Sequence, residues 1–376
     1  MTRDVSQNVP KIYDKGLDTI FLDKTVDFQG LGLLQVTQLK NQEYLSHFNH
    51  RTRGIYIYSL ESGKLKRKVT LAREGPDQIV FPIAVDYFIH NFDSIFIDTQ
   101  LNTYYLINDN AEIIKALGNR SKSFSAQDLS ISFESASFFD GDMVHGSIRM
   151  PFNGTPKETV YSRASMRLEG DLDIKLSVKN RDFIKNYEEV LAYRKEEENG
   201  TGMLINLPRY FVRQGEFLYA TTPVSDSIYV FKNGLLVEKF YAGVDGFEMA
   251  THIEFLNFTR TIRRPGEVIY EHETKRKAYY LKTLMDPAGQ FIYRILIEGT
   301  HPVLNERGND RIPELNGATL LAIDLSSQLI SAFELPIDEI LIERHSFAST
   351  KGVHFMVKEQ NNEDHVLFRI IGMDNK

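Results

Sequence analysis

The sequence predicts an all-β protein, a β-propeller of about six four-stranded blades that spans residues 1–376 as a single domain. Two observations predict this fold: short segments with strand composition recur along the chain, and they recur in a repeated order. Seven such segments are rich in β-branched or aromatic residues and are bounded by turn residues. They are GIYIYSL (54–60), SIFIDTQ (94–100), TYYLIND (103–109), EFLYATT (216–222), SIYVFKN (227–233), TLLAIDL (319–325) and VHFMVKE (353–359).

The repeated order defines the blades. Residues 93–120 and 215–243 both read as strand, polar loop, strand, tight turn, strand and Gly-containing loop, and residues 42–75 read the same way. One of the tight turns is Asn233-Gly234, and Asn-Gly is typical of hairpins because both residues tolerate a positive φ. A further strand precedes each unit, as LGLLQVTQ, FPIAVDYF and LPRYFVRQ, so each repeat has the four antiparallel strands of a propeller blade.

The predicted blades begin near residues 31, 81, 131, 205, 250 and 341. The last blade lacks a strand, and an N-terminal strand near residues 17–24 would complete it and hide the sheet edges. We expect a short helical insertion in blade three, near residues 150–200 with its helix in 182–200, and a Pro/Gly/Asn-rich loop over residues 299–317 in blade five. A pair of β-sandwiches and two separate β domains are the alternatives, but no Pro/Ser-rich linker divides the chain.

The composition excludes several classes of protein. A formal net charge of −7 argues against a broad nucleic-acid surface, and the absence of Cys excludes disulfides and thiolate ligands. No apolar run reaches the ~18 residues that a membrane helix needs, and the polar first residues lack the apolar core of a signal peptide. The protein is therefore expected in the cytoplasm, unless an export signal precedes this sequence.

The segment KVTLAREGPDQIVFP (68–82) places Gly and Pro beside charges between two apolar runs. A phosphate-binding loop would need Gly-Lys-Ser/Thr and a helix start, and neither follows. Gly75 permits an unusual backbone conformation and Pro76 fixes φ, so the segment predicts a connector between the first two blades.

The segment AREGPDQIVFP, its context YSLESGKLKRKVTLAREGPDQI and the YYL of residues 279–281 resemble uncharacterised six-bladed, TolB-like propellers of Bacteroidetes, among them a family known only as a domain of unknown function. The sequence departs from that pattern at Glu74 and at Asp77-Gln78. The resemblance implies an exported protein of the cell envelope, in the periplasm or as an outer-membrane lipoprotein whose lipid anchor lies outside this sequence. It implies no catalytic residues, because the family has none established.

The topology predicts where a ligand binds. In a four-stranded blade, the loops between the second and third strands lie on the same face as the connectors between blades, and loops on a rigid scaffold carry most binding residues. We therefore expect a protein or carbohydrate ligand over the mouth of the propeller on this face. The candidate contact residues are His50, Arg51, Arg73, Asp77, Asp98, Asn102, Asp226 and Glu271.

Two functions remain open. The first is a non-catalytic binding or scaffold propeller of the cell envelope, favoured because no zinc, EF-hand, nucleophile-elbow or CxxC motif occurs and no cofactor is predicted. The alternative is a Ca²⁺-dependent hydrolase of the lactonase or phosphotriesterase kind, with the ion held in the central channel. Residues on or near the predicted innermost strands that could face that channel are Asp86, Glu134, Glu254 and Asn257.

Overall fold

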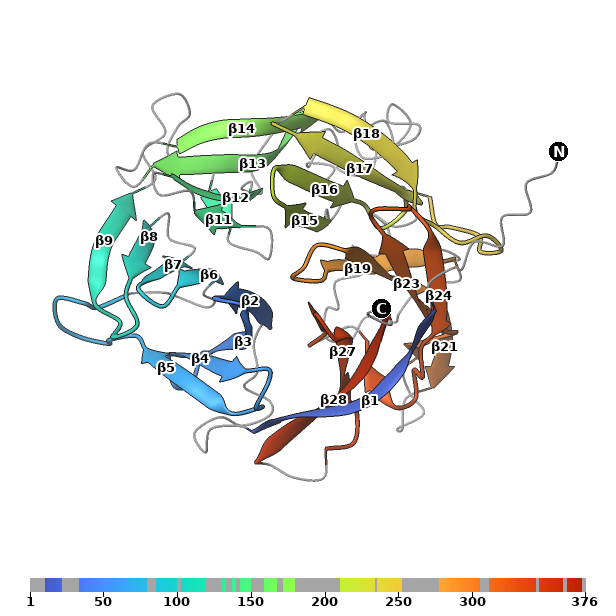
Figure 1. Ribbon diagram of the computed structural model, residues 1–376, viewed down its shortest axis with the longest axis horizontal. Helices are drawn as coiled ribbons and strands as arrows, with labels where there is room; N and C mark the ends of the chain where they lie inside the picture. The colour runs from blue at the N-terminus through green and yellow to red at the C-terminus, as the bar shows by residue number, and fades with distance from the viewer. Residues whose placement is uncertain are drawn as a thin grey trace.

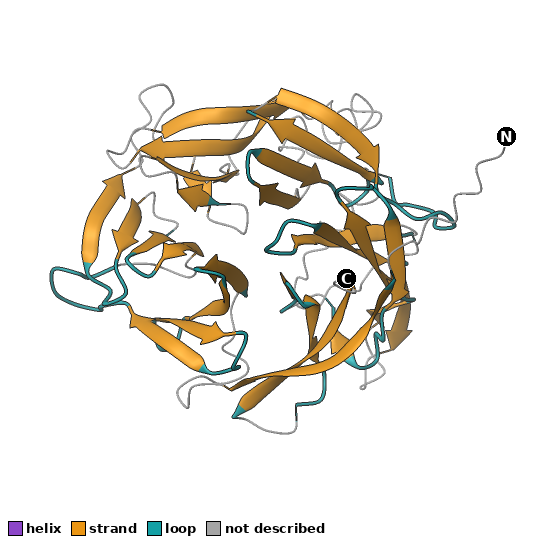
Figure 2. Ribbon diagram, in the orientation of Figure 1, coloured by secondary structure: helices purple, strands orange, loops and turns teal. Residues whose placement is uncertain are grey.

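The computed structural model describes strands and turns and, in the part of the chain that it describes, no helix. The described residues are 11–21, 34–79, 86–99, 103–118, 130–132, 137–139, 143–149, 159–167, 172–179, 210–233, 235–251, 277–304, 311–342, 345–360 and 364–373. The strands form antiparallel sheets that stand like spokes around a central axis (Figures 1 and 2). The predicted all-β propeller fold is therefore confirmed.

The first four sheets follow one another along the chain, and in each of them the strands pair mainly with their sequence neighbours. The first sheet contains β2 (Gln35–Leu39), β3 (Gln42–Asn49), β4 (Gly54–Ser59) and β5 (Leu65–Thr70). The second contains β6 (Asp86–Asn91), β7 (Ser94–Asp98), β8 (Thr103–Ile107) and β9 (Ile113–Gly118). The third contains β10 (Ser130–Ser132), β11 (Phe138–Phe139), β12 (Met143–Arg149), β13 (Thr159–Arg167) and β14 (Leu172–Lys179), and the fourth contains β15 (Tyr210–Gln214), β16 (Phe217–Thr221), β17 (Ser227–Lys232) and β18 (Leu235–Tyr241).

The fifth sheet and the sheet at the end of the chain, the closing sheet, depart from this simple order. The fifth contains β19 (Tyr279–Met285), β20 (Phe291–Ile297), β23 (Ala318–Asp324) and β24 (Ile330–Glu334), and a hairpin of β21 (Thr300–Leu304) and β22 (Arg311–Leu315) is inserted after β20. The closing sheet contains β25 (Ile340–Leu341), β26 (Phe347–Ser349), β27 (Gly352–Val357), β28 (His365–Met373) and the first strand of the chain, β1 (Ile12–Phe21).

Three details of the sequence prediction need correction. The insertion expected near residues 150–200 is not helical over residues 159–167 and 172–179, because these segments are β13 and β14 of the third sheet; the predicted helix, 182–200, lies outside the described residues. The loop predicted over 299–317 contains two paired antiparallel strands, β21 and β22, whose β-branched and other apolar residues are typical of strands. The sheets are also not uniformly four-stranded, because the third and the closing sheet have five strands each.

The hydrophobic core lies between neighbouring sheets. Alternate residues of β4 point to opposite sides: Ile55 and Ile57 pack against the second sheet, while Tyr56 and Tyr58 pack toward the closing sheet. Because a radial sheet is buried on both faces, its central strands are continuously apolar rather than alternating. This burial explains the run GIYIY in β4 and the run YRILI in β20, in which only Arg294 is charged.

The two ends of the described chain meet in the closing sheet. β1 pairs antiparallel with β28 at nine positions, from Ile12 opposite Met373 to Phe21 opposite His365. The N–H of Phe21 then donates to the carbonyl of Gly63 in the first sheet, with an N–O distance of 2.7 Å. β1 therefore completes one sheet and contacts the next, and in Figure 1 it lies across the gap between them.

Gly63 is the residue of this contact that tolerates least change. Its φ is +65°, and a Cβ there would lie 2.1 Å from the carbonyl oxygen of Thr19 in β1. We expect Gly63→Ala to lower the free energy of unfolding by roughly 2–4 kcal/mol, because it adds a left-handed backbone penalty to a steric clash. Urea denaturation would measure the loss. Gly75→Ala is the matched control, since Gly75 has a φ of +92° but nothing within 4 Å of the added Cβ; an equal loss in both variants would contradict the clash.

Candidate functional site

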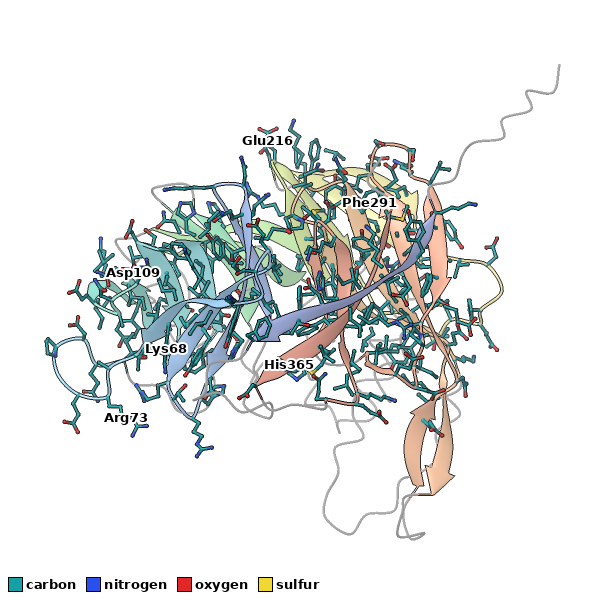
Figure 3. All side chains as sticks on the ribbon, turned by 60° about the horizontal axis from the view of Figure 1, so that its bottom comes forward. Lys68, Arg73, Asp109, Glu216, Phe291 and His365 are labelled. Carbon is teal, nitrogen blue, oxygen red and sulfur yellow. The ribbon has the colours of Figure 1, made fainter. Side chains whose placement is uncertain are left out.

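The loops predicted to bind a ligand lie on one face of the ring. We call it the connector face and define it by residues 50–53, 71–79, 222–226, 242–251, 335–339 and 358–360, which join second to third strands or one sheet to the next. In Figure 3, Arg73 and His365 mark this face at the lower side, and Glu216 lies on the opposite side. The hairpin of β21 and β22 projects beyond the other described strands in the direction of the connector face (Figure 3).

The segment after β5 is held as a connector between the first two sheets. Gly75 has a φ of +92° and accepts a hydrogen bond from the N–H of Gln78 at 3.1 Å. Arg53, itself left-handed with a φ of 56°, donates through Nη2 to the carbonyls of Ala72 at 3.1 Å and Ile79 at 2.5 Å. The Gly and Pro of this segment thus shape a turn that an arginine from the neighbouring loop supports.

Asp77, a predicted ligand contact, has a structural partner. Its Oδ1 accepts the backbone N–H of Ile113, at the start of β9, at 2.8 Å. The side chain is half-buried. The carboxylate therefore ties the connector to the second sheet.

Replacing Asp77 tests this tie. We expect Asp77→Ala to lower the free energy of unfolding by about 1.5–3 kcal/mol, because a charge-assisted hydrogen bond is lost and the Ile113 N–H loses its acceptor. Asp77→Asn keeps an acceptor oxygen and should cost less than half as much. Chemical denaturation compares the two variants, and equal stability of wild type and Asp77→Ala would show that the contact contributes nothing.

The cationic residues of the prediction lie together at the end of the first sheet. His50, Arg51 and Arg73 are exposed, and the His50 ring packs edge-on against Phe48 with 4.9 Å between centroids. Burial lowers the pKa of Arg53, and the positive charge of Arg73 lowers it further. The structure thus brings arginines from two loops within electrostatic reach of each other.

Asp226 belongs to a buried cluster that the sequence prediction missed. The Tyr280 hydroxyl donates to its Oδ1 at 2.5 Å, and the Arg294 guanidinium lies 3.4 Å from the centroid of the Tyr280 ring. Arg294 is fully buried and donates to the carbonyls of Ala242 at 2.8 Å, Ser225 at 2.6 Å and Thr222 at 3.4 Å. Burial lowers the pKa of Arg294 to about 10, so it remains a cation at neutral pH. The cluster joins the fourth and fifth sheets behind the connector face; the signal that could have found it is the lone charge inside the apolar run FIYRILI.

Two carboxylates of the prediction lie directly opposite each other in the second sheet. Asp86 begins β6 and pairs with Asp98 at the end of β7. Asp98 is fully buried and Asp86 half-buried. Cross-strand partners point to the same side of a sheet, with Cβ atoms about 5 Å apart. The other predicted residues, Asn102, Glu134, Glu254, Asn257 and Glu271, lie outside the described residues.

Ser349 and His354 have the geometry of a nucleophile and a base, but not the access. Ser349 Oγ lies 2.7 Å from His354 Nε2, and each residue is 1% exposed. The imidazole stacks on Phe347 with 4.5 Å between centroids, and burial lowers its pKa to about 3. A catalytic pair must contact its substrate. Because both side chains are buried, we assign this pair to the core of the closing sheet.

His47 is a second buried histidine and gives a prediction about acid stability. It is 1% exposed, its ring stacks beside those of Tyr56 and Tyr58, and burial lowers its pKa to about 4. The unfolded chain binds this proton near pH 6.5. The stability gained by keeping the ring neutral is therefore complete above pH 6.5 and is lost as the pH falls toward 4.

The free energy of unfolding should fall between pH 7 and pH 4.5. We expect this fall to be roughly 2–3 kcal/mol smaller in His47→Phe than in the wild type, because phenylalanine takes up no proton. Urea titrations at the two pH values would measure both losses. The remaining acid dependence should include His354, whose pKa is lowered in the same direction. An unchanged loss in His47→Phe would mean that His47 is not protonated on unfolding in this range.

The described part of the chain contains neither a metal-binding group of side chains nor a membrane-spanning helix. Within the described ranges, no group of three or more His, Cys, Asp or Glu side chains could hold a metal ion. In the same ranges, no helix has the length and apolar character to cross a membrane.

Comparison with known proteins agrees with this fold. One similar structure is the crystal structure of a DUF4221 family member from Bacteroides vulgatus. The match covers 98% of this chain and 100% of that chain, at 14% identity and a TM-score of 0.72. A candidate exported protein from Bacteroides fragilis matches at 11% identity and a TM-score of 0.57, with 100% of this chain and 98% of that one covered. No curated protein matches the sequence. The model of the family described as "Domain of unknown function (DUF4221)" matches residues 12–308, most of the chain, and the protein therefore belongs to the DUF4221 family.

Proposed function

We propose that the protein is a non-catalytic binding or scaffold propeller of the cell envelope, with six TolB-like blades in one domain and a protein or carbohydrate ligand at its connector face. In this proposal the five sheets that follow the chain and the closing sheet are the blades. The regular layout of these sheets supports the proposal, because a rigid ring presents its loops in fixed positions.

The observation that carries the proposal is the projecting hairpin of β21 and β22, called the arm. Its base continues the ladder of the fifth sheet through two hydrogen bonds, from the Glu298 N–H to Gly317 and from the Asn316 N–H to Gly299, each 3.0 Å long. Beyond this base the arm stands outside the ring (Figure 3). A two-stranded ribbon alone gains little stability from its own packing. Contacts with a ligand bound at the connector face would add to the stability that a two-stranded ribbon has on its own.

Shortening the arm tests the proposal. His301 and Glu314 are paired residues, so a two-residue Asn-Gly turn can replace residues 302–313 and leave the buried Thr300 in place. Affinity capture from a cell-envelope extract of the source bacterium, with quantitative mass spectrometry, would compare the shortened and intact proteins. We expect at least one partner to be retained by the intact protein alone. Identical partner sets, with both variants equally stable, would overturn the proposed role of the arm.

The cell-envelope location draws support from the Bacteroides fragilis relative, a candidate exported protein of the same fold. Fractionation of the source bacterium, followed by immunodetection, tests it. We expect the protein with the periplasmic or membrane fraction, and recovery with the cytoplasmic marker would contradict this location.

The Ca²⁺-dependent hydrolase is the second candidate, and the pair of Asp86 and Asp98 favours it. Carboxylate oxygens are ligands that Ca²⁺ prefers, and the register of β6 and β7 places these two carboxylates directly opposite each other. If Ca²⁺ binds there, removal by EDTA should lower the melting temperature of the wild type, and Asp98→Asn should abolish that shift. A melting temperature that does not respond to EDTA would eliminate this candidate.

A further inference from the structure

The first sheet has a charge opposite to that of the whole protein. Residues 42–79 contain seven Lys and Arg against four Asp and Glu, a net charge of +3, whereas the whole chain carries −7. One of the four acids, Asp77, accepts the Ile113 N–H and is engaged in the fold. The remaining residues of the chain therefore sum to −10, and the excess of positive charge is local.

Six of these seven cations form a continuous track, which we call the basic track; the seventh, Arg67, forms an ion pair with Asp109 of the second sheet. Lys64 and Lys66 are exposed at the start of the outermost strand β5, Lys68 is half-buried further along it, and Arg73 is exposed in the connector that follows. Lys68 lies over the Tyr56 ring, with Nζ 4.9 Å from the centroid. At the connector the track is joined by Arg51 and Arg53 from the adjoining loop. β5 has six residues, so the strand portion alone is ~20 Å long.

The basic track changes direction, and this shape limits its partner. Lys68 lies on the outer side of the ring, whereas Arg73 lies below it at the connector face (Figure 3). A flat membrane can approach only one of these surfaces at a time. A flexible linear polymer can follow both.

The aromatic residues of the first sheet argue against a nucleic acid. Proteins that bind single strands stack the bases on exposed aromatic rings. Tyr56 and Tyr58 are both fully buried, and residues 50–79, all of which are described, present no exposed phenyl or phenol ring. Residues 50–79 thus offer cations without stacking rings, and the exposed Phe21 beside Gly63 supplies a single ring at one end of the track, too few to stack successive bases.

We propose that the basic track binds an acidic polysaccharide, a linear carbohydrate whose carboxylate or sulfate groups pair with Lys64, Lys66 and Arg73 along the rim of the first sheet. This inference rests on the proposed binding function and names the chemical class of the ligand. Arginine supplies the planar donor pair that matches a carboxylate or sulfate at the connector face, and lysines supply point charges along the strand.

A heparin octasaccharide, which carries both anionic groups, is a suitable probe. We expect the triple variant Lys64→Gln, Lys66→Gln and Arg73→Gln to bind it roughly ten- to hundred-fold more weakly, and the logarithmic salt dependence of binding to fall by roughly two to three charges. The matched control Lys11→Gln, Lys239→Gln and Arg213→Gln removes three charges from exposed residues elsewhere and should change affinity less than two-fold. Glu74→Gln removes an exposed acid beside the track and should strengthen binding.

Three results would overturn the proposal. One is equal weakening in the triple variant and in its control. The second is octasaccharide binding no tighter than binding of an eight-residue oligothymidylate or of vesicles containing phosphatidylglycerol. The third combines two experiments: the arm-shortened protein loses its cell-envelope partner, but the triple variant keeps both that partner and the octasaccharide. In that case the binding function would stand, and the polysaccharide would not be its ligand.

Discussion

Deleting residues 1–21 should leave a protein that fails to fold cooperatively. The deletion removes β1, which pairs with β28 at nine positions and contributes Ile20, only 3% exposed, to the core between the closing and first sheets. It also removes the contact from Phe21 to Gly63. Loss of a whole strand with its core residue should cost more than about 5 kcal/mol, which is comparable to the total stability of a domain. Circular dichroism and the soluble fraction after expression would measure the result.

Two further variants distinguish the effect of the exposed side chains of β1 from the effect of its pairing and its buried residue. Leu17 is 62% exposed and Phe21 is 47% exposed, so Leu17→Ser and Phe21→Ser should each change stability by less than about 1 kcal/mol. A synthetic peptide of residues 11–21, added during refolding of the truncated protein, should restore part of the native signal. A truncated protein that melts like the wild type would show that β1 is not needed to close the ring.

Arg294→Ala should have the second largest effect, a loss of about 3–5 kcal/mol in the free energy of unfolding. The substitution leaves the carbonyls of Ala242 and Ser225 without their donor in the core between the fourth and fifth sheets. It also removes the cation that lies over the Tyr280 ring. Because the lost contacts join two sheets, we expect the denaturation curve to broaden as the sheets uncouple.

Arg294→Lys keeps the positive charge but not the planar fork, so it should recover less than half of the loss. Arg213→Ala, at an exposed position of β15, is the matched control and should cost less than about 0.5 kcal/mol. Urea denaturation of the three variants gives the comparison. A loss in Arg294→Ala no larger than in Arg213→Ala would mean that the buried contacts make no net contribution.

The fold could be predicted from local patterns because each sheet is built largely from consecutive strands. Runs such as GIYIYSL and SIYVFKN appear in the structure as β4 and β17, and Ser62-Gly63 and Asn233 lie at the turns after them. The prediction failed where the pattern was weak. β13 and β14 have many polar residues, and neither shows the apolar run that identified other strands.

The candidate site could be predicted only as a face. Strand order placed His50, Arg51 and Arg73 in connector-face loops, and the structure finds all three exposed there. Sequence could not show that Asp77 contacts Ile113 or that Asp226 contacts Tyr280, since those partners lie 36 and 54 positions away in the chain. Such contacts depend on how neighbouring sheets dock, which no local pattern encodes.

The pairing of β1 with β28 also determines how long β1 lacks its partner during translation. β1 leaves the ribosome before its partner β28, which begins at His365, 344 residues after Phe21. At translation rates of about 5–20 residues per second, the nascent strand waits roughly 20–70 s with its backbone donors and acceptors unpaired. During that interval the charges of Asp14, Lys15 and Asp18 and the bulge before Gly16 oppose pairing with other chains, so the same residues protect the strand before the ring closes.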